Sequence, residues 1–486
     1  MSWFTNDART QEGALQSATD RSSDAEMRQR VAGVDVEVPV YDGPPSPYVN
    51  VDNAATTPPF NCVLDTVYAF RQYYSSVHRG TGFKSLLSTH AYEHSRQVMT
   101  GFVGADPSYH TVLFTCNATH ALNKLARRLR LSPEDAVIIT LMEHHSNILP
   151  WRQQGCRVLE AKVKGNDGTL DVGDLEDKLR RNAGRVKAVS VTGGSNVTGH
   201  MPPYRRIARM AHEHGAWFVL DGTQLAPHRP VRMGAPDDPE RIDFFALSGH
   251  KMYAPFGCGL LVAPRKVFED GPPDLVGGGT VHAVTSDRVV WHDLPEKEEP
   301  GTPNVVGAVA LARAAREFQE IGLDNLVAHE QDLTRYCLKK LMAIDGLRIY
   351  GETDPELKRD RLGVFALEAK GFSHGLLAAI LGYEWGIGVR NGCFCAQPYV
   401  RELLGVSSDE MNRVLDKLGA GDHTSVPGLV RVSLGMYNTR DEIDYLADAL
   451  RSVLAHGPKA RYVLHPVHKD YVPEGWHVDY DDYLPL

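Results

Sequence analysis

The chain reads Val219-Leu220-Asp221-Gly222-Thr223-Gln224 near its middle, and Ser248-Gly249-His250-Lys251 shortly afterwards. Each stretch closes an apolar run of the kind that forms a buried strand, the second run being Ile242 to Leu247. An acid therefore follows one expected strand, and a lysine follows the next. Side chains that follow the carboxyl ends of neighbouring parallel strands gather at one edge of the sheet, where ligands bind.

This acid and lysine predict a site for pyridoxal phosphate (PLP). Lys251 offers an amine for a Schiff base, and Asp221 offers a carboxylate to face the pyridinium nitrogen. Ser248 and His250 add hydroxyl and imidazole donors for the phosphate. A lone lysine is more often a solvated surface group. The position of Lys251 after a second buried-type strand favours the cofactor site.

Strand-like and helix-like segments alternate from Val49 to about Pro264, which predicts an α/β fold with a mostly parallel sheet covered by helices. The strand-like runs there are 111–115, 136–141, 186–192, 217–220, 242–247 and 259–262. Later strand-like runs, at 347–350, 364–368 and 430–434, predict a smaller α+β domain after a loop-rich section.

These patterns divide the chain into a large PLP-binding domain at 48–310 and a small C-terminal domain at 311–453. We expect residues 48–80 to join the small domain in part. The polar N-terminal extension, 1–47, is expected to be partly helical or mobile. A helical insertion is expected at 401–427, beside the loop that carries Cys395, and a tail at 454–486.

Composition narrows the class of protein. The chain has 486 residues, 42% of them hydrophobic, and a net charge of −9, which argues against nucleic acid or an anionic membrane as partner. No apolar run approaches the roughly 20 residues that span a bilayer, and the N-terminus does not resemble a secretory signal. Seven scattered cysteines do not suggest a disulfide framework, so we expect a cytoplasmic location.

Several stretches in unbroken order, covering about residues 48–452, resemble the class V (fold-type I) PLP enzymes, and within them the group II cysteine desulfurases and selenocysteine lyases. The matching stretches are Val77-His78-Arg79-Gly80, Glu143-His144-His145-Ser146-Asn147, Ser195-Asn196-Val197-Thr198-Gly199, Asp221-Gly222-Thr223-Gln224, Ser248-Gly249-His250-Lys251, Gly301-Thr302-Pro303-Asn304 and Arg390-Asn391-Gly392-Cys393-Phe394-Cys395-Ala396-Gln397-Pro398.

The resemblance implies cofactor-binding roles. Lys251 would hold PLP and then move a proton, and Gln224 would donate to the ring phenolate. His144 would stack on the ring, with a structural role as the alternative, and His145 is expected to be structural. Asn196 would lie near the phenolate and the substrate. The phosphate would be bound by Thr119, Ser248 and His250, and by Thr302 of a second subunit, which implies a homodimer with shared sites.

One cofactor stretch departs from the family. The usual Gly-Thr-Thr is Asn117-Ala118-Thr119 here, with one hydroxyl missing, so phosphate binding would depend more on backbone groups at the start of a helix.

A buried arginine at 431 predicts a substrate carboxylate site. Arg431 lies in an apolar strand, where an unpaired charge is costly, and a carboxylate is its natural bidentate partner. The alternative, judged weaker, is an internal ion pair with an Asp or Glu. Arg390 would bind substrate on the same side or orient the following loop. His78 resembles a residue at the active-site edge, with a structural role nearly as plausible.

Cys395 determines the expected reaction, because it aligns with the desulfurase nucleophile. A thiolate there would take sulfur from L-cysteine as a persulfide and leave alanine. The alternative is that Cys395 only packs in the interior as a small apolar side chain. Such a nucleophile needs a mobile loop, framed here by Gly392 and Pro398. Cys393 could relay the persulfide, form a disulfide with Cys395, or be a bystander; two cysteines alone do not predict a metal.

The function expected is therefore a cysteine desulfurase-like C–S lyase that acts on L-cysteine or a related amino acid, with a sulfur-acceptor protein as a further partner. The alternative is a class V aminotransferase, epimerase or eliminating lyase in specialised metabolism. A non-catalytic scaffold is disfavoured because Lys251, Asp221, His144 and Arg431 occur together.

Overall fold

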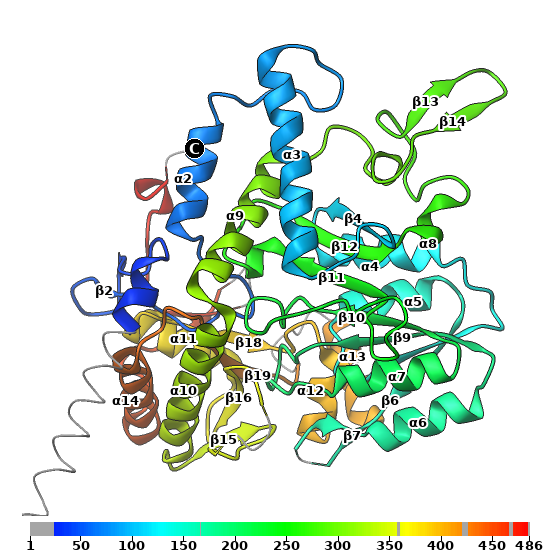
Figure 1. Cartoon of the computed structure of the whole chain (residues 1–486). Coiled ribbons are helices and arrows are strands. Elements are labelled where there is room, and N and C mark those ends of the chain that lie inside the picture. Colours follow the sequence, from blue (N-terminus) through cyan, green and yellow to red (C-terminus); the bar gives the residue numbers. More distant parts are fainter. Residues whose placement is uncertain (1–23, 166, 357–359, 420–425, 466–469, 485–486) are drawn as a thin grey trace, which may run out of the picture.

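A seven-stranded sheet forms the centre of the larger part of the molecule (Figure 1). The computed structural model describes residues 24–165, 167–356, 360–419, 426–465 and 470–484. The strand order is β4-β12-β11-β10-β9-β5-β6, and only β12 runs against the others. The strands are β4 (His110–Thr115), β5 (Ala136–Thr140), β6 (Arg157–Ala161), β9 (Val186–Thr192), β10 (Trp217–Asp221), β11 (Phe244–Ser248) and β12 (Gly259–Pro264).

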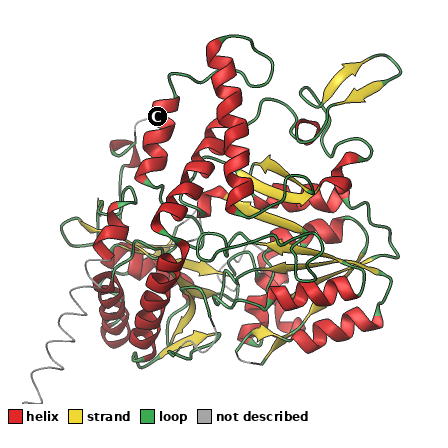
Figure 2. Cartoon of the chain, viewed as in Figure 1, coloured by secondary structure: helices red, strands yellow, loops and turns green. Residues whose placement is uncertain are grey.

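Both faces of this sheet are buried, so its strands read as continuous apolar runs. Alternate residues enter two cores: Leu220 packs in the first and Val219 in the second. Helices that contribute to the first core are α2 (Asn61–Phe70), α3 (Phe83–Phe102), α6 (Val172–Arg181), α7 (Tyr204–Glu213) and α9 (Val305–Ile321). Those of the second core are α4 (Ala118–Arg128), α5 (Leu149–Gln153) and α8 (Arg265–Glu269). The predicted α/β fold with a mostly parallel, helix-covered sheet is confirmed (Figure 2).

Two features of the sheet were not predicted. β6 lies at the edge and is largely half-exposed, so it lacks the continuous apolar run that marked the other strands. β12 matches a predicted strand, but its antiparallel direction depends on a tight return after β11 that periodicity does not reveal.

A four-stranded antiparallel sheet, in the order β15-β16-β19-β18, forms the smaller part. Its strands are β15 (Leu347–Tyr350), β16 (Val364–Ala369), β18 (Arg390–Gly392) and β19 (Leu429–Ser433). It shares a separate core with α10 (Leu323–Met342), α11 (His374–Trp385) and α14 (Arg440–His456). β3 (Val49–Asn50) pairs with β17 (Ile387–Gly388), and Val49 and Val51 pack in this core, whereas Phe60 and Val63 pack in the first.

Along the chain, the change from the first core to the core of the small part comes later than the expected domain boundary of 310/311. The buried side chains of α9 belong to the first core, and those of α10 from Leu333 onward belong to that of the small part. We therefore propose that the boundary lies near Gly322, which separates α9 from α10.

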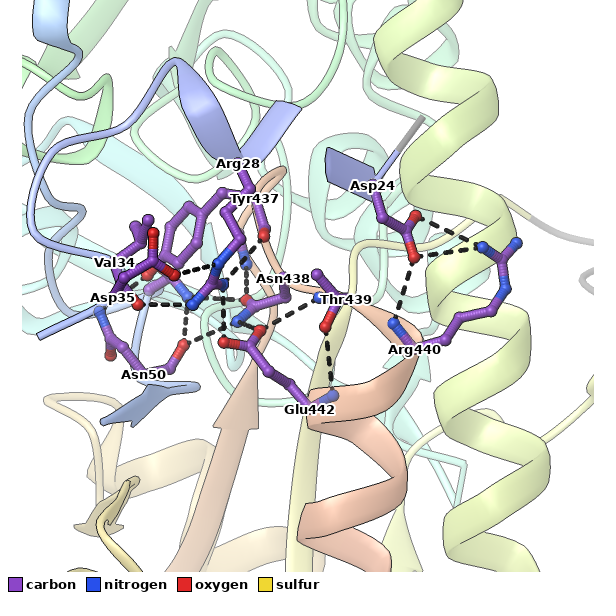
Figure 3. A network of polar contacts seen from close by, with 12 residues as sticks. Asp24, Arg28, Val34, Asp35, Asn50, Tyr437, Asn438, Thr439, Arg440 and Glu442 are labelled. Atoms are coloured by element: carbon purple, nitrogen blue, oxygen red, sulfur yellow. Dashed lines mark hydrogen bonds and ion pairs between the residues drawn. The ribbon is translucent and has the colours of Figure 1, made fainter. Parts of the chain in front are cut away.

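The N-terminal extension is fastened to the small part where the structure describes it. Residues 24–29 are helical, and residues 1–23 of the predicted extension lie outside the described chain. Arg28 donates to Asp35 (2.8 Å) and to Glu442 at the start of α14 (2.7 Å), and the Arg440 N–H donates to Asp24 (3.2 Å; Figure 3). Within the extension, β1 (Glu37–Val38) pairs with β2 (Ser46–Pro47). In the larger part, β7 (Val163–Lys164) pairs with β8 (Thr169–Leu170) just after β6.

The tail contains the hairpin β20 (Tyr462–Leu464) and β21 (Tyr471–Pro473), which lies against α11. Glu384 of α11 accepts bonds from the Lys459 and Ala460 N–H groups (2.9 and 3.1 Å). Another hairpin, β13 (Val281–Val284) with β14 (Val289–Trp291), projects from the larger part (Figure 1). None of the helices in the described ranges combines the length and the apolar character that crossing a membrane requires.

Candidate active site

A cavity of about 230 Å³ opens where β9, β10 and β11 end. It also receives residues from the small part, so it lies between the two sheets. The residues predicted for the site that line it are Thr119, His144, Asn196, Asp221, Gln224, Ser248, His250, Lys251, Arg390, Cys395 and Arg431. Positions spread over some three hundred residues of sequence therefore converge on one space.

Asp221 and Lys251 have the electrostatic environment expected of a cofactor site. Asp221 is the last residue of β10, is buried, and accepts a bond from the Thr223 N–H at 3.1 Å. Burial raises the pKa of its carboxyl. Burial, followed by the positive charge of Arg431, lowers the pKa of Lys251 to about 8. The amine is therefore much nearer to its neutral, nucleophilic form at physiological pH than an ordinary lysine.

The first turn of α4 forms one end of the cavity. The Asn117 side chain caps the helix by accepting from the His120 N–H (2.9 Å), and the Ala118 N–H donates to Ser248 Oγ (2.8 Å). Gly259 allows the backbone to come close here, because a Cβ on it would lie 2.5 Å from the Asn117 Cα. The dipole and backbone N–H groups of a helix N-terminus suit a phosphate, so the backbone of this turn can replace the missing hydroxyl at 118.

His144 and Ser146 form a pair that the sequence did not fully reveal. The Ser146 N–H donates to His144 Nδ1 at 3.1 Å, so the ring proton of the neutral imidazole resides on Nε2. Ser146 Oγ lies 2.6 Å from Thr119 Oγ1, which links the ring-stacking candidate to the phosphate end. Burial, and then the charge of Lys251, lowers the pKa of His144 to about 4.

Glu143 directly precedes His144. No role was predicted for it from the sequence, because an acid next to a histidine does not by itself indicate a function. Its carboxyl is fully buried and accepts from Thr140 Oγ1 (2.5 Å), Asn147 Nδ2 (2.7 Å) and the Thr192 N–H (3.0 Å). Burial raises its pKa to about 8. The network fixes the backbone that presents His144.

Two predicted amide donors support backbone segments in this structure. Gln224 Nε2 donates to the Ala54 carbonyl (2.7 Å), and Asn196 Nδ2 donates to the Phe394 carbonyl (2.7 Å). Each amide nitrogen has a second hydrogen, so both side chains retain a donor for a bound molecule.

Arg431 forms an internal ion pair in this structure, and its role as the substrate carboxylate site stays a prediction. Its side chain is buried on β19, and Nη2 donates to Asp52 Oδ1 at 2.8 Å, so the internal ion pair that was judged weaker is the one present. Nη1 donates to the Asn196 carbonyl (3.1 Å), while buried Nε has no partner within the described part of the chain. Arg390 is 59% exposed, 4.0 Å from Asp52. Asp52 could not be found from sequence because it precedes Arg431 by 379 residues.

The loop that carries Cys395 lies between β18 and α12 (Gln397–Leu404) and is anchored at several points. The Cys395 carbonyl accepts from the His145 N–H (2.7 Å), and the Gln397 N–H donates to His145 Nε2 (3.2 Å), which fits the structural role expected of His145. Phe394 and Cys395 both have positive φ, 52° and 55°, a conformation that is costly for these residues and concentrates at functional sites. Cys395 is exposed and lines the cavity, on a loop that these bonds connect to the large part.

Cys393 lies in a different environment. It is half-buried, its thiol donates to the Pro427 carbonyl at 3.0 Å, and burial raises its pKa to about 11. Pro427 ends the predicted insertion, which contains the second half of α12 and all of α13 (Ser408–Gly419), with residues 420–425 outside the described chain. The prediction that the insertion lies beside the Cys395 loop is thus confirmed for its described ends.

Two predicted site residues lie elsewhere. His78 and Thr302 line a second cavity, of about 430 Å³, together with Arg79 and Glu299. His78 Nε2 is 3.0 Å from Glu93 Oε1, a pairing that raises its pKa. The structure therefore does not place His78 at the substrate site of its own chain. His78 and Thr302 thus line a cavity different from the one that contains Lys251.

The cavity fits PLP by the chemistry of its donors. It has a buried acid, a lysine with lowered pKa, a helix N-terminus, and a neutral histidine, His144, for the ring face. The site could thus hold the ring between His144 and Asp221 and the phosphate near Thr119.

Known proteins resemble the chain over most of its length. The class V aminotransferase model matches residues 49–446. A cysteine desulfurase of Haloferax volcanii is 34% identical over 437 residues, which cover 88% of this chain and 95% of that protein. A probable cysteine desulfurase of Streptomyces coelicolor is 35% identical over 426 residues, covering 85% and 93%.

Solved structures of cysteine desulfurases also resemble this chain. The apo structure of a cysteine desulfurase from Thermococcus onnurineus has a TM-score of 0.73 at 29% identity and covers 84% of this chain and 95% of its own. The cysteine desulfurase CsdA of Escherichia coli has a TM-score of 0.72 at 27% identity and covers 89% and 98%. These matches confirm the resemblance read from the sequence motifs: the chain belongs to the class V aminotransferase family.

Proposed function

We propose that this protein is a PLP-dependent cysteine desulfurase, which moves sulfur from L-cysteine to Cys395 and releases alanine. The observation that carries the proposal is the meeting, in one cavity, of an exposed thiol on an anchored loop with Lys251 and Asp221. The similarity to cysteine desulfurases supports the same activity.

When bound, PLP would withdraw electrons from the substrate α-carbon and so labilise its α-proton. Asp221 would keep the ring nitrogen protonated by its negative charge, which the buried position makes more effective. Lys251, with its pKa near 8, can release and take up a proton at the substrate carbons. His144 is neutral and would cover one face of the ring and exclude water.

The substrate carboxylate would bind at Arg431. In this structure Asp52 holds Nη2, and Nε is without a partner among the described residues. A carboxylate that took both donors would satisfy Nε and displace Asp52 toward exposed Arg390, 4.0 Å away. Asp52 therefore would keep a buried arginine neutralised until substrate arrives.

Sulfur transfer needs a thiolate near the substrate sulfur. The Cys395 thiolate would attack that sulfur, a new S–S bond would form as the Cβ–S bond breaks, and the electron pair would stay with the carbon fragment. Lys251 would then protonate that fragment toward alanine. A sulfur-acceptor protein or an added thiol would reduce the Cys395 persulfide and restore the thiolate.

The active form is proposed to be a cytoplasmic homodimer with shared sites. His78 and Thr302 line a cavity of their own, away from Lys251. A partner subunit that placed this second cavity against the first would supply Thr302 to the phosphate.

The proposal is tested by the products formed from L-cysteine in the presence of dithiothreitol. Wild type should form alanine and sulfide in equal amounts, and Cys395→Ser should lose both while it retains the cofactor's visible absorption. Pyruvate and ammonia, with turnover unchanged in Cys395→Ser, would instead assign an eliminating lyase of the same family.

A further inference from the structure

Two cysteines outside the proposed chemistry face each other at the end of the large sheet. β4 and β12 run antiparallel, with Thr115 opposite Gly259. Continued one residue beyond the ends of the two strands, this register would place Cys116 opposite Cys258. Cys116 is exposed and Cys258 is buried, so a reagent in solvent can reach one member of the pair.

Three hydrogen bonds show in which direction the peptide groups around Cys116 and Cys258 point. Along a strand, peptide groups point alternately to the two sides. The Phe114 N–H donates to Glu299 (2.7 Å), away from β12, because β4 is the edge strand. Two residues later, the Cys116 N–H likewise donates away from β12, to His120 Nδ1 (3.3 Å).

The peptide group of Cys258 points to the opposite side. Its carbonyl accepts from the Gly249 N–H (2.8 Å), on the side of β11. Cys116 and Cys258 thus have the peptide orientations of a non-hydrogen-bonded cross-strand pair, in which Cα atoms are about 4.5 Å apart and side chains are closest. That separation lies within the range of about 4.4–6.8 Å found in disulfides.

The side chains also share one face of the sheet. The cross-strand pair two residues back, Phe114 and Leu260, packs in the first core, and the pair before it, Leu113 and Leu261, packs in the second. Alternation therefore puts Cys116 on the same face as Cys258, which belongs to the first core. Rotation of Cys258 away from the Gly259 carbonyl, 3.6 Å from its sulfur, would bring the thiols together.

We propose that Cys116 and Cys258 form a reversible disulfide, a modification site next to the phosphate-binding end of the cavity. Hydrogen peroxide oxidises the Cys116 thiolate to a sulfenic acid, and its second oxygen leaves as water. The Cys258 sulfur then attacks the Cys116 sulfur, the S–O bond breaks, and water leaves with the Cys258 proton. Two thiols lose two electrons to one peroxide, and a dithiol reverses the change.

The position links this modification to the cofactor. Cys116 precedes the α4 cap at Asn117, and Cys258 holds Gly249 within the Ser248–Lys251 turn. A movement of Cys116 toward Cys258 would shift the N–H groups of the first turn of α4. We expect this shift to cost the bound phosphate about one charge-assisted hydrogen bond. The oxidised protein would therefore release PLP roughly tenfold faster. This consequence rests on the proposed function, whereas the disulfide itself does not.

The test is peptide mapping of the full-length holoprotein under non-reducing conditions after brief peroxide treatment. To remove the competing Cys393–Cys395 pair, the mapping is repeated in Cys393→Ser/Cys395→Ser. We expect one disulfide-linked peptide that joins residues 116 and 258, lost in Cys116→Ser, lost in Cys258→Val, and reversed by dithiothreitol. Cys116→Ser alters an exposed side chain and so keeps the test valid if Cys258→Val does not fold.

Overoxidation of Cys116 without a link to Cys258, or a link from Cys116 to another cysteine, would overturn the proposal. Cofactor release is followed by visible absorption in parallel. An unchanged release rate in the cross-linked protein would overturn the coupling. A protein that cross-links but never binds PLP would contradict the proposed function and leave the disulfide intact.

Discussion

The two walls of the active-site cavity are built differently. One wall belongs to the large sheet, where Asp221 and Ser248 end parallel strands and their side chains bond to nearby backbone groups. The other wall belongs to the small part, where Cys395 sits in a loop with two consecutive positive φ angles and Arg431 is neutralised by Asp52. The first wall is organised to hold a cofactor. The second wall, with its stored strain and exchangeable ion pair, is organised to meet a substrate and select its reaction.

The same contrast separates two cysteines on the second wall. The Cys393 thiol donates to Pro427, and its raised pKa keeps it protonated. Cys395 is exposed to the cavity. Of the alternatives for Cys393, these contacts favour a bystander that ties the insertion to the loop, since a protonated thiol is a poor nucleophile.

The largest expected effect is on the first wall. Lys251→Ala should abolish the visible absorption of bound PLP and lower turnover of L-cysteine by about 10³-fold or more, because both the Schiff base and the proton carrier are lost. Absorbance spectra and alanine release measure the two effects. His250→Asn is the matched control in the same turn and should keep the absorption band; a band that persists in Lys251→Ala would show that another amine holds the cofactor.

The next largest effect should be on the second wall, without a change in cofactor binding by the first. Cys395→Ser should lower sulfur transfer by at least about 10²-fold and leave the absorption spectrum unchanged, because only the nucleophile is removed. Cys393→Ser should stay within about threefold of wild type. Sulfide release assays compare the pair. Equal losses in both variants would mean that Cys393 relays sulfur.

Arg431 and Asp52 should have opposite effects on substrate binding. Arg431→Lys removes the bidentate contact and should raise KM for L-cysteine about 10–100-fold. Asp52→Asn removes the competing carboxylate and should lower KM by about two- to fivefold. Steady-state kinetics distinguish the two, with a spectrum of each variant to check cofactor loading. A raised KM in Asp52→Asn would assign Asp52 to binding the substrate amine or to folding.

The smallest effect is on pH dependence. The pKa of Lys251 is lowered to about 8, so the neutral amine increases as pH rises, and uptake of PLP by the apoprotein should accelerate up to about pH 8 and then level off. In the unfolded chain the proton is held more tightly, so the apoprotein should gain stability between about pH 8 and 10.5. His144, with its pKa near 4, should add no inflection near pH 6.5. An inflection there that vanishes in His144→Asn would contradict this charge state.

The sequence predicted the first wall better than the second, for a physical reason. Strand ends such as Asp221 and Ser248 are marked locally by an apolar run followed by polar residues, and parallel topology brings them together. Asp52 reaches Arg431 only because β3 pairs with β17 and residue 52 bridges Ser433, contacts between segments far apart in sequence. No local pattern records such pairings.

Other features of the site could not be predicted from the sequence because they too depend on contacts between distant segments. The Cys395 loop accepts bonds from His145 and Asn196 of the large part, contacts that could not be read from Gly392 and Pro398 alone. His78 lines a different cavity of its own chain, a position that a motif shared with a family does not reveal.

The most direct test of the two-wall account is the location of sulfur after one turnover. The holoprotein is mixed with L-cysteine without reductant, the free thiols are blocked, and the peptides are mapped by mass. The account predicts one added sulfur atom on the peptide that contains Cys395, at position 395 and in a yield that matches the alanine formed. Alanine formed with no sulfur on that peptide, or with the sulfur at Cys393, would contradict it.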